Sequence, residues 1–135
     1  MPDAPLEALE VRFLDRFFDN DVMTAMQKPA FELLKTDGAR KDEVMAEARR
    51  ALDLAYGWLE QKLAGCTWAA GDTMSLADCA AAPSLFYADW VHPIAKAHPT
   101  LRAYRSRLLT WPAFARAANE ARPYRHYFPL GGAGT

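Results

Sequence analysis

A chain of 135 residues has the length of one ordinary domain and is too short for two. Hydrophobic residues make up 51% of it, enough for a core without metal ions or disulfide bonds. Alanine contributes 26 residues and leucine 15, whereas valine and isoleucine together contribute five. Sheets are built largely from β-branched and aromatic residues, so this composition predicts an all-α fold. It argues against a β-sandwich and against a doubly wound α/β fold.

The chain lacks the marks of a membrane or secreted protein. It has no run of about 20 uncharged apolar residues, and residues 1–5 lack the basic and apolar regions of a secretion signal. Its two cysteines, Cys66 and Cys79, cannot form a disulfide framework, and we expect buried, inert thiols. The sequence therefore predicts a cytoplasmic protein that does not bind a membrane.

Charge is distributed unevenly along the chain. The net charge is −4 over residues 1–37, −3 over 38–91 and +6 over 92–135. The basic C-terminal third could form a solvated face balanced by the acidic part, or it could meet an anionic ligand or a nucleic acid. Since neither a lysine run nor a pattern of stacking aromatics accompanies the charge, a nucleic-acid partner is not expected.

The first helix is expected to begin near Asp3, with Pro5 in its first turn. Two apolar rows run along it at helical spacing: Leu6, Leu9, Phe13 and Phe17 form one, and Leu14, Phe18, Val22 and Met26 the other. Two adjacent rows predict a wide buried stripe. Pro29 should kink or end this helix, and residues 36–38 are a clear stop.

A second helix is predicted over residues 42–63, and two shorter helices open at Pro99 and Pro112. The second helix carries a single apolar stripe formed by Val44, Ala48, Leu52, Ala55, Leu59 and Leu63. The glycine-rich end, residues 131–135, is expected to be disordered, which leaves residues 1–130 as a single helical domain.

The sharpest local signal opens the third helix, at residues 75–78 (SLAD). In a capping box, the hydroxyl of Ser75 accepts from the N–H of Asp78, whose carboxylate accepts from the N–H of Ser75. Such a cap contributes about 1 kcal/mol, so both residues are structural. Residues 80–90 have almost no polar face, which places this helix at the centre of a bundle of about five helices. Pro83 within it predicts a kink.

Catalytic motifs are missing from the sequence. It contains neither a glycine-rich phosphate loop nor a nucleophile elbow. His92, His98 and His126 do not form a helical metal-binding pair. We therefore predict no catalytic residue and no metal site in this chain.

The segment 68–78 (WAAGDTMSLAD), followed by an alanine-rich stretch and Pro83, resembles the C-terminal helical domain of glutathione S-transferases. Residues 98–104 and 111–123 resemble the two closing helices of that domain. Residues 16–27 resemble the long first helix of its bacterial members. The resemblance covers essentially the whole chain.

This resemblance implies a two-domain enzyme. A thioredoxin-like domain, missing from these residues, would bind glutathione and supply the catalytic Ser, Tyr or Cys. The thiolate of glutathione, the cosubstrate, would attack a hydrophobic electrophile. The helical domain would provide the pocket for this substrate and the surface of a homodimer. It would hold no cofactor of its own and would be inactive alone. The alternative is a free-standing, non-catalytic protein-interaction module.

The resemblance also places part of the first helix at the cleft between the two domains. The residues expected to bind substrate there are Phe17, Asn20, Met23, Thr24 and Gln27, with Tyr87 and Trp90 closing the cleft from the third helix. Methionine adapts to varied apolar ligands, and amide side chains can orient a polar group. Phe17 and Met23 could equally be packing residues of the core, and for Trp90 core packing is the favoured interpretation.

Overall fold

The structure is a computed structural model that describes residues 2–35 and 40–128. Its elements are α1 (Pro5–Phe17), η1 (Phe18–Met23), α2 (Thr24–Lys35), α3 (Lys41–Lys62), α4 (Leu76–Val91), α5 (Pro99–Thr110), α6 (Pro112–Ala121) and η2 (Arg122–Tyr127). An isolated bridge between Trp68 and Gly71 is the only β pairing in the described part of the chain. The predicted all-α fold is therefore confirmed. Because α1, η1 and α2 are consecutive segments of one first helix, the described residues also form the expected bundle of about five helices.

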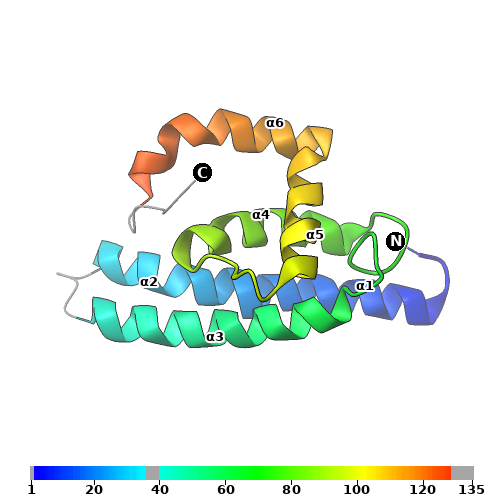
Figure 1. Cartoon of the computed structure of the whole chain (residues 1–135), viewed down its shortest axis with the longest axis horizontal. Helices are drawn as coiled ribbons and strands as arrows, with labels where there is room; N and C mark the ends of the chain where they lie inside the picture. Colours follow the sequence, from blue (N-terminus) through cyan, green and yellow to red (C-terminus); the bar gives the residue numbers. More distant parts are fainter. Residues whose placement is uncertain (1, 36–39, 129–135) are drawn as a thin grey trace.

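The helices are stacked in layers around α4 (Figure 1). The first helix and α3 run side by side, α5 crosses over α4, and α6 lies on the side away from α3. Most residues of α4 are buried, and it contacts α1, η1, α2 and α5. Pro83 lies inside α4 without ending it. The prediction of a central apolar helix is therefore confirmed. Among the described residues, no helix is both long and apolar enough to cross a bilayer.

The first helix contains a turn of π-helix, which the sequence pattern did not indicate. The backbone N–H of Thr24 donates to the carbonyl of Asp19, five residues earlier, and the hydroxyl of Thr24 donates to the same oxygen at 2.9 Å. Pro29 does not end the helix, which continues to Lys35. The stop predicted at residues 36–38 lies outside the described residues.

The two apolar rows of the first helix are buried to very different extents. The second row is buried as predicted, with Phe18 and Val22 both 0% exposed. The first row is not: Leu6 is 81% exposed and Phe13 55%. The predicted wide buried stripe is wrong in this half, because α1 packs mainly on α4, which covers only one of its sides.

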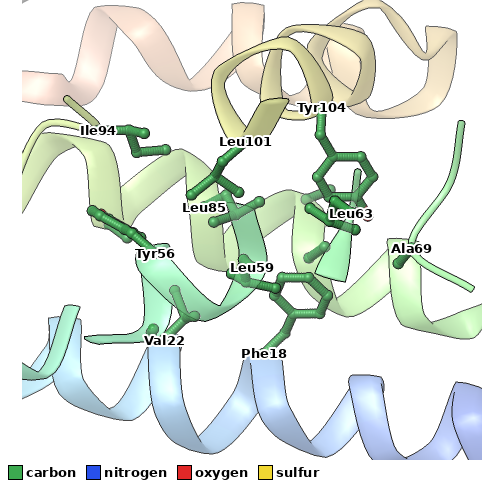
Figure 2. Packing of buried hydrophobic residues seen from close by; sticks show 14 of the residues in the cluster. Phe18, Val22, Tyr56, Leu59, Leu63, Ala69, Leu85, Ile94, Leu101 and Tyr104 are labelled. Carbon is green, nitrogen blue, oxygen red and sulfur yellow. The ribbon is translucent and has the colours of Figure 1, made fainter. Parts of the chain in front are cut away.

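The core lies where the buried side of the first helix meets α3, α4 and α5 (Figure 2). The ring of Phe18 stacks on that of Tyr104, with 6.5 Å between their centroids. The hydroxyl of Tyr56 donates to the carbonyl of His92 at 2.9 Å. Burial, with the nearby carboxylate of Asp89, raises the pKa of Tyr56 far above its usual range. All six residues of the predicted α3 stripe are buried.

A glutamate on α3 caps the first turn of α5. The carboxylate of Glu60 accepts from the backbone N–H groups of Thr100, at 2.9 Å, and Leu101, at 2.8 Å. Burial alone would raise the pKa of Glu60, but these hydrogen bonds outweigh it and lower the pKa. The cap ties α5 to α3 through two N–H groups that the helix itself leaves free.

We expect Glu60→Gln to lower the free energy of unfolding by about 1 kcal/mol at pH 7, since the half-exposed site is screened by solvent. The pKa is lower in the folded state, so the carboxylate's contribution is complete above its ordinary pKa of 4.5 and is lost as pH falls through the folded value. Urea denaturation from pH 7 downward should show the two proteins converging below that pKa. Glu47→Gln, on the exposed side of α3, is the matched control and should show no such convergence.

Candidate functional site

Asp78 joins three segments at the start of α4. It is 0% exposed, and its carboxylate accepts from the N–H of Ala69 at 2.9 Å, the N–H of Ser75 at 2.9 Å and the hydroxyl of Tyr104 at 2.6 Å. The capping box of Ser75 and Asp78 is present, although the Ser75 hydroxyl faces the N–H of Asp78 without a hydrogen bond of regular geometry. Burial and the Asp78 carboxylate raise the pKa of Tyr104, so its phenol remains a proton donor. Asp78 therefore positions the loop before α4 and also α5.

A surface of exposed apolar side chains covers neighbouring parts of α1 and α3; we call it the outer face. The rings of Phe13 and Trp58 meet edge to face with centroids 5.8 Å apart, and Phe17 approaches Trp58 to 4.5 Å. Its exposed members are Leu6, Leu9, Phe13, Leu54 and Trp58. In the described structure these side chains lie largely open to solvent, so they are available to a partner.

A groove of about 450 Å³ opens between the first helix and α3 beside the outer face. Two of the residues predicted to bind substrate, Phe17 and Asn20, line it. Its other lining residues are Asp21, Ala25, Lys28, Ala51, Leu54, Ala55 and Trp58. The groove thus joins aromatic and aliphatic surface to polar groups, a combination typical of small-molecule sites.

The other residues predicted to bind substrate lie elsewhere. Met23 packs partly against the core, Thr24 is engaged with the π turn, and Gln27 is half-buried outside the groove lining. Tyr87 and Trp90 belong to an aromatic cluster at the end of α4, where the ring of Phe128 lies 6.2 Å from Tyr87 and 5.4 Å from Trp90. Trp90 also lines a second cavity with Phe86, Arg122 and Arg125. The structure therefore brings Phe17 and Asn20 together in the groove and Tyr87 and Trp90 together at the end of α4, and it places the other three residues at neither site.

Comparison with known proteins identifies the fold. The family model described as "Glutathione S-transferase, C-terminal domain" matches residues 21–112, more than half of the chain. The chain belongs to this family. The solved structure of FzlA from C. crescentus is similar to it with a TM-score of 0.72 and 28% sequence identity, over 84% of this chain and 53% of that one. The chain thus spans about half the length of that protein. A search of curated proteins with this chain found no match.

The prediction of buried thiols is wrong for this glutathione S-transferase C-terminal domain. Cys79 is exposed, and Cys66 is only partly buried. Successive residues of an α-helix are rotated by about 100°, so the inward position of Asp78 turns Cys79 toward solvent. Within residues 2–35 and 40–128, no three His, Cys, Asp or Glu side chains gather in a way that could hold a metal ion.

Two features of the domain's surface were missed from the sequence. Leu54 and Trp58, four residues apart, form a second apolar row on α3 outside the buried stripe, and this spacing could have indicated the outer face. The arginines beside Trp90 are more than 30 residues away in sequence and carry no local signal.

Proposed function

We propose that this domain is the helical half of a glutathione transferase, and that it forms a homodimer through the outer face. In the proposed reaction, the glutathione thiolate forms a bond to carbon of an apolar electrophile as the leaving group departs. In this proposal a thioredoxin-like domain activates the glutathione thiol. The groove beside Phe17 and Asn20 is our candidate for the site of the electrophile.

The exposure of the outer face is the observation that supports this proposal. Large apolar side chains in a contiguous exposed patch are uncommon on monomers and typical of association sites. Phe13 and Trp58 are residues of the kind that anchor interfaces. The ion pair between Lys62 and Glu10 lies between the same two helices, so these charges are already compensated. Because the face extends along two neighbouring helices, a second copy can meet it in a self-complementary, two-fold arrangement.

The test of this proposal is the mass of the chain in solution. We expect sedimentation equilibrium at micromolar concentration to give twice the chain mass of 15.1 kDa. Phe13→Glu should give the monomer, because it places two charges in an apolar contact, and it should remain folded since Phe13 is 55% exposed in the single chain. Tyr127→Glu, at a 73% exposed residue of η2, is the matched control and should remain dimeric.

A monomeric wild-type chain, or a dimer that persists in Phe13→Glu, would contradict the pairing. A monomer that binds a different protein through the outer face would instead support the alternative function, a non-catalytic interaction module.

A further inference from the structure

A second cavity lies between the end of α4 and η2, apart from the outer face and its groove. Its volume is about 230 Å³, and it is lined by Phe86, Trp90, Arg122 and Arg125. The two aromatic side chains form a rigid wall, with Phe86 4% and Trp90 6% exposed. The guanidinium of Arg125 lies over the indole ring of Trp90, 4.7 Å from its centroid.

Two residues of the cavity wall, Trp90 and Arg125, carry buried hydrogen-bond donors without acceptors in the described structure. The indole Nε1 of Trp90 and the Nε and Nη2 atoms of Arg125 are buried and have no hydrogen-bond partner within the described structure. Leaving buried donors unpaired is unfavourable, and more so where the group is charged. These donors belong to two of the four residues that line the cavity.

The cationic groups here also lack compensating carboxylates. Residues 92–135 contain one acid, Glu120, and it is paired with Arg116 at 2.9 Å. On α4, Asp89 accepts from the N–H of Ile94 and faces Arg105 at 3.7 Å. Among the described residues, no ion pair neutralises Arg122 or Arg125. The missing acceptor is therefore expected to carry negative charge.

We propose that this cavity binds a small organic anion, a carboxylate or phosphate carried on a flat apolar group. The anion accepts hydrogen bonds from Arg125 and the Trp90 indole, with Arg122 adding positive charge at the edge. The apolar group packs on Phe86 and Trp90. A cavity of about 150 Å³ holds benzene, so this cavity has room for one ring and its charged substituent. The inference does not rest on the proposed dimer, because the two sites share no residue.

Calorimetric titration of the full chain with phenylacetate and with phenyl phosphate tests the site and distinguishes the two anions. We expect saturable binding of at least one of them. The neutral amide phenylacetamide and the ringless anion acetate should each bind about tenfold more weakly or worse.

Arg125→Gln should lower the affinity for the bound anion by about tenfold or more, and Trp90→Phe, which keeps a ring but removes the indole N–H, by about fivefold. Arg122→Gln, at an exposed residue, provides a second variant that does not threaten folding. Arg116→Gln is the matched control and should bind as the wild type does. Equal affinity for phenylacetamide, unchanged binding in both Arg125→Gln and Arg122→Gln, or no saturation by either anion at millimolar concentration would overturn the proposal.

Discussion

Asp78→Ala is expected to lower the free energy of unfolding by about 3–5 kcal/mol. The substitution removes the shared acceptor of the Ala69 and Ser75 N–H groups and the Tyr104 hydroxyl, and the first and last of these hydrogen bonds are buried. A small domain has only about 5–15 kcal/mol of stability in total, so the loss should be visible as a large shift of the urea midpoint.

Two variants separate this network from a simple helix cap. Ser75→Ala should cost less than about 1 kcal/mol, because its hydroxyl lacks a regular hydrogen bond. Tyr104→Phe should cost about 1–2 kcal/mol, because it leaves two of the three donors on the carboxylate. If Ser75→Ala and Asp78→Ala cost the same, the local cap would be the main contribution and the role assigned to Ala69 and Tyr104 would be wrong.

Phe18→Ala should cost about 3–5 kcal/mol, the range found when a buried aromatic side chain is truncated. Phe18 is 0% exposed and packs on Tyr104 between the first helix and α5, so the substitution opens a cavity in the core. Urea denaturation at neutral pH measures the loss. The dependence of the free energy of unfolding on urea concentration should be the same in both proteins, as expected for two-state unfolding.

The neighbouring residue provides the control for this substitution. Phe17 is only partly buried and meets Trp58 at the outer face, so Phe17→Ala should cost less than about 1.5 kcal/mol in the single chain. A similar loss at both positions would mean that the boundary between core and outer face does not fall between them.

The sequence predicts the architecture well because the strongest signals are local. The periodic stripe of α3 and the capping segment of α4 each depend on residues three or four positions apart. The bounds of α3 lie within a residue of the prediction, and α4 begins where the capping segment places it. The hydrogen bond from Ser75 to Asp78 is local as well. The bonds from Ala69 and Tyr104 to the same carboxylate are tertiary, and so the larger role of Asp78 could not be inferred.

The site was harder to predict because its residues come together through tertiary contacts, which local spacing does not reveal. Periodicity shows that Leu6, Leu9 and Phe13 lie on one side of a helix, but it does not show whether another helix of the same chain covers that side. The π turn adds a residue to one turn and changes the directions in which Met23 and Gln27 point relative to Phe17. Trp90 and Arg125 meet only because η2 folds back onto α4.

The division of the first helix into an exposed row and a buried row also bears on how this chain can evolve. The exposed row, from Leu6 to Phe13, is separate from the buried row that contains Phe18 and Val22. Mutations in the exposed row are expected to cost little in folding, because they leave the packing density of the interior untouched. If the row forms the proposed interface, a lineage carrying this helix could exchange one binding partner for another while its tertiary structure stays constant.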